Sequence, residues 1–313
     1  MNKPDALNPL VSVIVTTRNE ERNISNCLKS IQLQTYKPIE MIVVDNNSTD
    51  RTQEIALSYT DVVVNKGPER SAQRNHGICD LATGKYAMFI DADMILTPTL
   101  IETCVREIQR EGVVALHIEE VILGIGKLAK IRRYERSFYS GTVIDGARFF
   151  LRSRFSGIGG FDVDLPPGPE DWDLDKRLKK FGEILLVNSA GEEYEWELHK
   201  FIKNQNKDSH NGYIGIYHNE GEQTLRSYLS KKRYYSPSMN AYIAKWGTND
   251  PDVQKQLGMM YRYVIVFLEK SKYKKTLLNP VITLEMLFLR MIVGAIYLVE
   301  KRAKVIDTNA KQA

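Results

Sequence analysis

The chain has 313 residues, of which 43% are hydrophobic and 26% charged, and its formal net charge is +4. It is long enough to bury a sizeable core, either as one large domain or as two closely packed halves. The three cysteines lack the spacing of a metal site, and the polar residues 1–9 lack the apolar core of a signal peptide.

Charge is unevenly distributed along the chain. Residues 224–313 contain 16 Lys or Arg against 6 Asp or Glu. This basic C-terminal third indicates an anionic partner, such as lipid headgroups, a phosphate-rich ligand or nucleic acid. Cys27, Cys79 and Cys104 lie in apolar contexts and are expected to be reduced core thiols in a cytosolic setting.

In roughly the first ninety residues, short apolar runs alternate with helical patterns. Strands are predicted at Leu10–Thr16, Ile39–Val44, Asp61–Val64 and Tyr86–Ile90. Four such strand–helix steps indicate an α/β fold whose doubly wound, mostly parallel sheet is flanked by helices and binds a nucleotide. The turn after the first strand, TTRNEERN, contains no Gly-x-Gly-x-x-Gly, which argues against a dinucleotide dehydrogenase.

The second part of the chain is more mixed. Strands or extended segments are predicted at Val113–Ile118, Ala147–Leu151, Glu183–Val187 and Gly212–Tyr217, the last of which delivers His218. A helix is predicted to begin at Glu170, with Leu174, Leu178 and Phe181 on its buried face. Further helices are predicted at Lys127–Tyr139, Gln223–Tyr235, Ser238–Trp246, Val253–Lys270 and Pro280–Lys304. Residues 192–211 are polar and show no clear pattern.

Two carboxylates, Asp91 and Asp93, directly follow the strand Tyr86–Ile90. Ligands of open α/β sheets bind at this end of the strands, and side chains two apart on an extended chain point the same way. The pair could therefore converge on one hard cation, Mg²⁺ or Mn²⁺. A bare Asp-x-Asp is also common in solvated turns, so the interpretation depends on the flanking segments.

The succession of motifs resembles the family-2 glycosyltransferases of GT-A fold. The resemblance covers roughly Leu10–Tyr235 and is carried by VSVIVTTRNE, EMIVVDNNSTD, RSAQRNHG, AMFIDAD, GGFD, GPEDWDLDKRL and then His218. Each motif alone is weak, but seven in order at sensible spacings make a specific pattern. The resemblance implies a GT-A domain at 1–235, with a nucleotide-binding half at 1–96 and an acceptor half at 97–235, followed by a helical tail at 236–313.

The resemblance also implies roles for individual residues on the donor side. The residues matching those that hold the base and ribose are Thr17, Glu20 and Asp45, with Arg74 beside the nucleotide pocket. Asp91 matches a ribose or metal contact, and Asp93 matches the ligand of Mn²⁺ or Mg²⁺. This chain departs from the usual pattern at Thr16, Arg18 and Asn46–Asn47, which leaves the nucleotide open, although uracil is favoured.

On the catalytic side, Asp171 matches the general base, and Glu170 is the alternative. Carboxylates in a first helical turn are also favoured by the helix dipole, so a capping role for the pair stays open. His218 matches a residue near the metal and the diphosphate, whereas a lone histidine is more often an ordinary surface or core residue. Lys232 and Arg233 match basic residues placed against the diphosphate.

The implied reaction is an inverting, metal-assisted single displacement. It moves a sugar from a nucleotide-diphosphate sugar to a hydroxyl of a lipid-linked glycan or polyprenyl acceptor. The alternatives are a soluble polysaccharide or protein acceptor, a sugar nucleotidyltransferase, and a non-catalytic nucleotide-binding protein. A nucleotidyltransferase would show a Gly-rich loop after its first strand, and no nucleic-acid-binding motif supports a nucleic-acid partner.

The C-terminal segment Leu277–Val299 is strongly apolar but contains Pro280, Glu285 and Arg290. Each central charge costs about 2.5 to 3.5 kcal/mol on insertion into a bilayer, which disfavours a spanning helix. Flanking basic residues favour an anionic membrane surface over packing as ordinary core; they are Lys270, Lys272, Lys274 and Lys275 before the run and Lys301, Arg302 and Lys304 after it. We therefore expect a cytoplasmic protein, peripheral on the inner face of the cell membrane, of undetermined oligomeric state.

Overall fold

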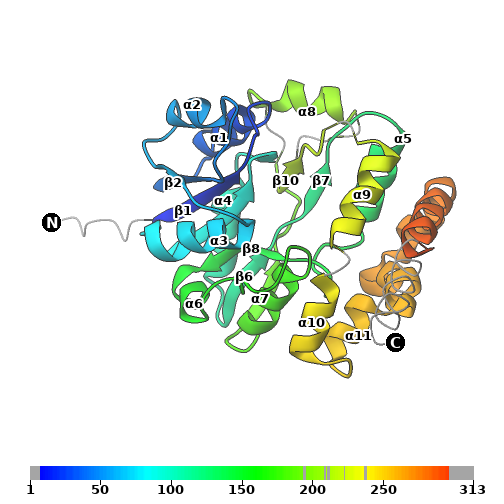
Figure 1. Cartoon of the computed structure of the whole chain (residues 1–313). Coiled ribbons are helices and arrows are strands. Elements are labelled where there is room, and N and C mark those ends of the chain that lie inside the picture. Colours follow the sequence, from blue (N-terminus) through cyan, green and yellow to red (C-terminus); the bar gives the residue numbers. More distant parts are fainter. Residues whose placement is uncertain are drawn as a thin grey trace.

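The computed structural model describes residues 8–192, 195–207, 209, 212–221, 223–235 and 238–295. Its centre is a seven-stranded sheet in the order β3-β2-β1-β4-β8-β6-β9 (Figure 1). The strands are β1 (Val11–Thr17), β2 (Ile39–Asp45), β3 (Val63–Asn65), β4 (Tyr86–Asp91), β6 (Val113–His117), β8 (Ala147–Leu151) and β9 (Glu183–Leu186). Neighbouring strands are parallel except at β8, which runs antiparallel to both β4 and β6.

A second, three-stranded sheet lies beside the end of β4. Its order is β5-β10-β7, with β5 at Met94–Leu96, β10 at Ile216–His218 and β7 at Glu120–Ile122. β10 pairs antiparallel with β5 and parallel with β7. This small sheet joins three segments that are far apart in the sequence.

Successive side chains of each strand point to opposite faces of the large sheet, so a hydrophobic core forms on each face. On one face, Val11, Val13 and Val15 pack against α1 (Ile24–Gln32) and α4 (Leu100–Ile108). Side chains of the opposite parity, including Ile14 and Phe89, pack against the other helical layer. That layer comprises the π-helix η1 (His76–Leu81), α6 (Arg152–Gly157) and α7 (Glu170–Leu178). The remaining helices of this part are α2 (Thr52–Leu57), α3 (Arg70–Asn75), α5 (Lys127–Arg136) and α8 (His199–Gln205).

The C-terminal helices share a further core with α5 and α7. They are α9 (Leu225–Tyr235), α10 (Ser238–Trp246), α11 (Pro251–Leu257), η2 (Tyr261–Ile265), α12 (Val266–Leu268), the 3₁₀ turn η3 (Glu269–Ser271), α13 (Tyr273–Leu278) and a helix over residues 280–295. Phe267 and Met286 pack in one cluster with Ile131 of α5 and Trp172 of α7. Figure 1 shows these last helices, in orange, along the edge of the molecule opposite the N-terminus.

The α/β class is confirmed, and so are helices at the C-terminus. The predicted strands are present, but Asp61–Val64 is extended only from Val63, and Gly212–Tyr217 forms a strand only over Ile216–His218. The single helix predicted at Val253–Lys270 is wrong, because the chain leaves the helical conformation at Gly258 and Lys270 adopts a positive φ. Phe181 is exposed, since α7 ends before it. Helix Pro280–Lys304 is present up to residue 295, and its remainder lies outside the described residues.

Candidate active site

The carboxyl ends of β1, β2 and β4 meet at one edge of the large sheet. Thr17 is in register with Asp45, and Thr16 is in register with Asp91. Thr16 Oγ1 donates a hydrogen bond of 3.0 Å to Asp91 Oδ1. The sequence motifs of the first ninety residues therefore converge on this edge, as the parallel topology requires.

Asp45 is buried and organises the turn that follows β2. Its carboxylate accepts hydrogen bonds from Ser48 N at 2.7 Å, from Ser48 Oγ at 2.5 Å and from Gln53 Nε2 at 2.8 Å. Thr17 Oγ1 is buried with no hydrogen-bond partner among the described residues. The role of Thr17 and Asp45 as base contacts stays a prediction, which this placement at the strand ends permits.

Glu20 follows β1 and lies near the two aspartates after β4. Its Oε2 accepts a hydrogen bond of 2.8 Å from Asn23 Nδ2. Burial raises the pKa of Glu20, and repulsion from Asp93 and Asp91 adds to this effect against the opposing hydrogen bond from Asn23. The site thus collects several carboxylates, which is the electrostatic condition for attracting a cation.

Arg74 of α3 is the buried centre of the site. Its guanidinium lies 3.0 Å from Asp91 Oδ1 through Nη2 and 3.4 Å from Asp171 Oδ1 through Nη1. The guanidinium also stacks over Phe89, with its Cζ 4.1 Å from the ring centroid. Although burial opposes ionisation, Arg74 and then Arg148 hold the pKa of Asp91 well below its usual range.

Glu170 and Asp171 open α7 but lie in different environments. The Glu170 side chain is 0% exposed and is paired with Arg70, and its Oε2 accepts a hydrogen bond from Gly168 N. The Asp171 side chain is 29% exposed. Burial, reinforced by the adjacent Glu170 and opposed by Arg74, raises the pKa of Asp171 to about 6. Asp171 is therefore the accessible carboxylate of the pair.

Asp93 faces His218 of β10. The chain turns at residues 92–93, so the alternation of an extended strand does not apply there. Pairing of β5 with β10 places His218 Nε2 3.1 Å from Asp93 Oδ2. Burial disfavours the charged imidazole, but Asp93 and Glu120 outweigh it and raise the pKa of His218 to about 10.

The chemistry of this corner fits a divalent cation with few protein ligands. Asp93 Oδ1 is buried and has no hydrogen-bond partner in the described part of the chain. Within that part, no group of three or more His, Cys, Asp or Glu side chains is arranged to hold a metal. Asp93 and His218 could supply one carboxylate and one imidazole, and oxygens of a bound diphosphate would have to complete the coordination.

Sequence reasoning did not identify Glu120, Arg136 and Arg148, which lie beside these residues. Arg148 Nε donates to Glu120 Oε1 at 2.5 Å, and Arg136 Nη2 lies 3.4 Å from the same oxygen. All three line a cavity of about 180 Å³ together with Asp171 and Trp172. No motif marks them, because β7 has only three residues and β8 looks like ordinary core.

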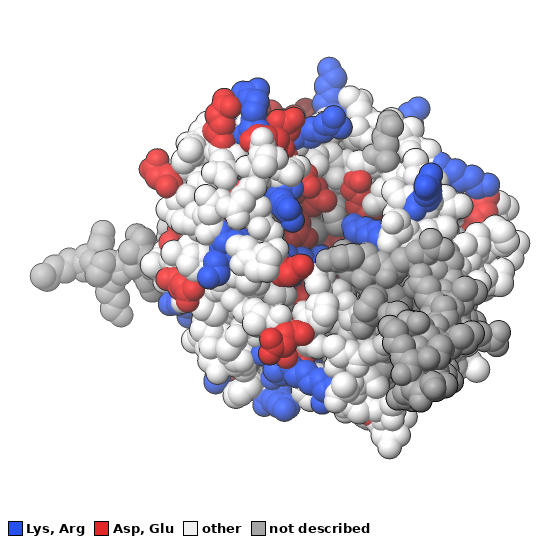
Figure 2. Space-filling model, in the orientation of Figure 1, with Lys and Arg blue, Asp and Glu red and all other residues white. Residues whose placement is uncertain are grey.

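Figure 2 shows acidic and basic side chains gathered around a hollow near the centre of one face. Lys231 of α9 lies 3.8 Å from Glu220 Oε1. Lys232 and Arg233 also belong to α9, but their side chains lie outside the described residues. Their proximity to a diphosphate therefore stays a prediction.

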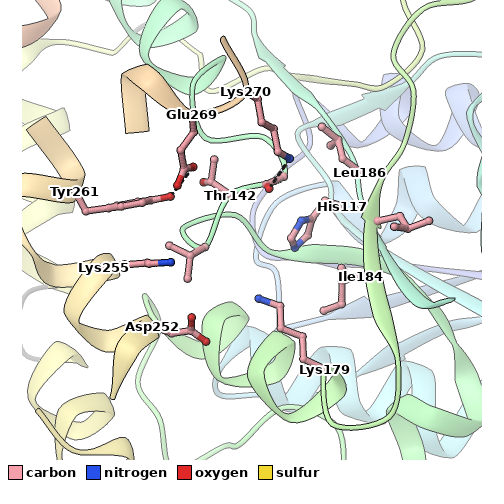
Figure 3. Close-up of a pocket in the computed structure, with 13 residues that line it drawn as sticks. His117, Thr142, Lys179, Ile184, Leu186, Asp252, Lys255, Tyr261, Glu269 and Lys270 are labelled. Atoms are coloured by element: carbon pink, nitrogen blue, oxygen red, sulfur yellow. Dashed lines mark hydrogen bonds between the residues drawn. The ribbon is translucent and has the colours of Figure 1, made fainter. Parts of the chain in front are cut away.

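A second cavity, of about 370 Å³, lies on the other side of the segment 141–146. It is bordered by β9, by the end of β6 and by the C-terminal helices, as Figure 3 shows. His117 lines it, and His117 Nε2 is 2.6 Å from Asp175 Oδ2 of α7. Lys179, Lys255 and Lys270 also border this cavity, and none of the predicted site residues does.

Comparison with known families and sequences gives a consistent result. Residues 12–159 match the sequence model of Glycosyl transferase family 2. The chain is 35% identical over 99 residues to the uncharacterized glycosyltransferase YibD of Escherichia coli, covering 30% of this chain and 28% of YibD. It is 35% identical over 113 residues to glycosyltransferase GlyG of Streptococcus pneumoniae, covering 34% of this chain and 37% of GlyG. The matched region thus spans little more than a third of these relatives at most.

Solved structures resemble the whole fold at low sequence identity. The mannosyltransferase PcManGT from Pyrobaculum calidifontis, in complex with GDP-Man and Mn²⁺, covers 99% of this chain and 84% of its own at TM-score 0.54 and 17% identity. TarS 1–349 of S. aureus in complex with UDP covers 85% and 76% at TM-score 0.51 and 16% identity. These likenesses establish the GT-A architecture.

Proposed function

We propose that this chain, which carries a glycosyl transferase family 2 domain on a GT-A fold, transfers a sugar from a nucleotide-diphosphate sugar to an acceptor hydroxyl with inversion. The observation that carries this proposal is the position of Asp171. It lines the cavity of about 180 Å³ and is joined through Arg74 to Asp91 at the end of β4. A single displacement needs a base that accepts the proton of the acceptor hydroxyl, and this base must face the strand ends where the donor binds.

The donor binds over the ends of β1, β2 and β4. Thr17, Glu20 and Asp45 contact the base and ribose in this proposal, and Arg74 holds the adjacent carboxylates in place. The solved complexes of similar fold contain UDP or GDP-Man, so a nucleotide diphosphate fits this architecture. A UDP-sugar is the proposed donor.

Asp93 and His218 would hold Mn²⁺ or Mg²⁺ at the donor diphosphate, with Asp91 as a ribose or further metal contact. A divalent cation at this position neutralises negative charge on the leaving diphosphate. The buried Asp93 Oδ1, which has no hydrogen-bond partner among the described residues, supports this assignment. Lys232 and Arg233 would add positive charge at the same diphosphate.

Asp171 takes the proton of the attacking hydroxyl. Its side chain is accessible from the cavity, whereas Glu170 is fully buried against Arg70. Arg74 keeps the Asp171 carboxylate oriented and offsets its negative charge. Trp172 provides an apolar wall in the same cavity, on which the ring of a sugar acceptor could pack.

A donor screen tests the transfer reaction directly. The full chain is incubated with UDP-sugars and GDP-mannose, with and without Mn²⁺, and release of the nucleoside diphosphate is measured. We expect metal-dependent release from one donor class, and Asp171→Asn should abolish it. Absence of release from every donor, with acceptor extracts present, would contradict the proposal.

The proposed acceptor is lipid-linked, because the C-terminal helices expose an unusual apolar surface. No helix in the described part of the chain has the length and hydropathy needed to cross a bilayer. The apolar surface consists of exposed side chains of residues 259–291: Met259, Met260, Val264, Ile265, Leu268, Tyr273, Leu277, Leu278, Val281, Leu284, Phe288 and Met291. In the last helix the exposed stripe lies opposite the buried Met286 and Leu289. An apolar stripe facing outward is typical of a surface that binds a membrane or a partner.

The charges around this surface favour an anionic bilayer as the partner. Lys270 Nζ donates to Gly141 O at 3.0 Å, Lys272 Nζ to Phe138 O at 2.6 Å, and Lys275 Nζ to Ser137 Oγ at 2.9 Å. These acceptors are uncharged, so the contacts anchor the tail without pairing the lysines with an anion. Burial lowers the pKa of Lys272 to about 8 and also lowers the pKa of Lys275, which an anionic surface would oppose. Lys301, Arg302 and Lys304 lie outside the described residues.

Sedimentation with liposomes tests the membrane surface. The full chain is compared with a variant carrying Leu277→Ser, Leu278→Ser and Phe288→Ser, and with a control carrying Ile125→Ser and Val163→Ser at exposed apolar positions elsewhere. The wild type and the control should sediment with anionic vesicles at low salt, and the tail variant should remain in the supernatant. If the wild type also remains there, a soluble polysaccharide or protein acceptor becomes the better proposal.

A further inference from the structure

Glu120 of β7 is a buried carboxylate in contact with three cationic side chains. The Glu120 side chain is only 5% exposed. Its Oε1 accepts a hydrogen bond from Arg148 Nε at 2.5 Å and lies 3.4 Å from Arg136 Nη2, while its Oε2 lies 3.6 Å from His218 Nδ1. No other described carboxylate makes contact with all three of these groups.

The three-stranded sheet places Glu120 beside His218. β7 and β10 pair in parallel, with Glu120 opposite Ile216 and Ile122 opposite His218. Glu120 and His218 are thus displaced by two positions across a strand pair, so their side chains share one face of the sheet. On its other side, β10 pairs with β5, which brings His218 beside Asp93.

The two ring nitrogens of His218 therefore face different carboxylates. Nδ1 points to Glu120 at 3.6 Å, and Nε2 points to Asp93 at 3.1 Å. A carboxylate facing Nδ1 orients the ring and can hold the Nδ1 proton while a cation takes the place of the proton on Nε2. Histidine ligands of metals are commonly fixed by such an outer carboxylate, and its loss weakens metal binding by about 10- to 100-fold.

We infer that Glu120 is a positioning residue of the transfer site, which orients His218 toward the cation and holds Arg148 beside Asp171. This inference rests on the proposed function. Glu120 touches neither the donor nor the acceptor; it acts through two side chains that do. Through Arg148 it also reaches the acceptor side, because the buried Arg148 Nη1 has no hydrogen-bond partner among the described residues and Arg148 lines the cavity of Asp171.

The Glu120 carboxylate faces two guanidinium groups and one imidazole, so its charge and its reach can be tested separately. Glu120→Gln would keep the shape and remove the charge that the three cations share. Glu120→Asp would keep the charge, but the carboxylate would lie farther from the three cations because the side chain is one methylene group shorter.

Direct binding of Mn²⁺ in the presence of UDP tests the inference without relying on turnover. Calorimetric titration of the full-length protein should show Mn²⁺ affinity lowered about 10- to 100-fold in Glu120→Gln and less in Glu120→Asp. The matched control is Glu119→Gln, which makes the same change at the adjacent position and should bind Mn²⁺ as the wild type does. In a His218→Ala background, Glu120→Gln should have no further effect on Mn²⁺ binding.

The outcomes separate this inference from the proposed function. If the wild type binds no Mn²⁺–UDP, the proposed function itself fails. If the wild type binds and a folded Glu120→Gln binds equally well, only the role of Glu120 is refuted. Thermal unfolding of each variant is measured in parallel; if both Glu120 variants unfold, or if Glu120→Gln still weakens binding after His218 is removed, Glu120 is structural and the inference is wrong.

Discussion

Arg74 Nη1 lies 3.4 Å from Asp171 Oδ1, although the two residues are 97 positions apart in the sequence. The same guanidinium bonds Asp91 at 3.0 Å, so one buried cation joins the end of β4 to the start of α7. The donor side and the base of the proposed reaction therefore share a single counter-charge.

Asp171→Asn should lower kcat by about 100- to 10,000-fold, because the proton acceptor is lost while its shape is kept. Binding of UDP, measured by calorimetry, should stay close to wild type. Glu170→Gln should behave differently, since it removes one partner of a buried ion pair and should lower the free energy of unfolding by about 3 kcal/mol. An inactive Glu170→Gln beside an active Asp171→Asn would reverse the assignment of the base.

The rate of transfer should depend on pH through Asp171. Its pKa is raised to about 6, and a base must be ionised to accept a proton. We therefore expect kcat/KM to rise with pH up to about 6 and to level off above it. Arg74→Gln removes the cation that opposes the rise in the Asp171 pKa, so the inflection in the pH profile of kcat/KM should move to higher pH. An unchanged inflection in a folded Arg74→Gln variant would show that another group controls the profile.

The contribution of Asp171 to folding stability should fall with rising pH, whereas its contribution to the rate should increase. Because the folded-state pKa of Asp171 is raised, the folded protein holds this proton more tightly than the unfolded chain. The stabilising contribution of the protonated group is present below the unfolded-state pKa, near 3.9, and is lost as pH rises to about 6. Chemical denaturation of wild type and Asp171→Asn at pH 4.5 and pH 7 should show the variant gaining stability relative to wild type at the higher pH.

Removal of the divalent cation should abolish transfer. EDTA should inactivate the wild type, and added Mn²⁺ should restore it, because the leaving diphosphate needs a compensating charge. Asp93→Ala should stay inactive at the Mn²⁺ concentration that restores wild type. Cys79→Ser, at a half-buried position outside the site, is a suitable control. Full activity of the wild type in EDTA would remove the cation from the mechanism.

Gly146→Ala should displace the base without unfolding the chain. A Cβ at position 146 would lie 2.7 Å from Cβ of Asp171, closer than two such atoms approach in proteins. The added methyl group must push Asp171 or the 141–146 segment, and a small misplacement at a reacting centre can cost about 100-fold in rate. Gly157→Ala, where a Cβ would meet nothing within 4 Å, is the matched control. Activity assays with thermal unfolding distinguish misplacement from unfolding.

Sequence patterns identified β1, β2 and β4 because these strands have six or seven residues, most of them buried. The pattern of β1, buried at all seven positions, is that of a strand covered on both faces. β5 and β7, which no pattern predicted, have three residues each, and this is too short for any periodicity. Their pairing depends on contacts between distant segments that no local pattern contains.

The same reason explains which site residues could be predicted. Asp91, Asp93 and Asp171 stand in motifs, whereas Glu120 and Arg148 acquire their positions through β7 and β8. Strand alternation predicts that Asp91 and Asp93 point the same way; the structure has a turn at residues 92–93 and a contact of Asp93 with His218, and a cation shared by the two aspartates stays a prediction. Burial of Glu170 against Arg70, which favours Asp171 as the base, also appears only in three dimensions.

The reversed strand β8 has a consequence for how the protein becomes active during synthesis. Among the described strands, its ladder with β4, from Tyr86–Leu151 to Met88–Phe149, is what joins β3-β2-β1-β4 to β8-β6-β9 within the large sheet. Pairings between distant segments close long loops and are expected to form after local ones. Asp91 ends β4, on one side of this ladder, whereas Asp171 belongs to α7, which follows β8 in the sequence. If Asp171 is the base, as proposed, a nascent chain that has folded only its first strands would bind a donor without being able to use it until the acceptor side has docked.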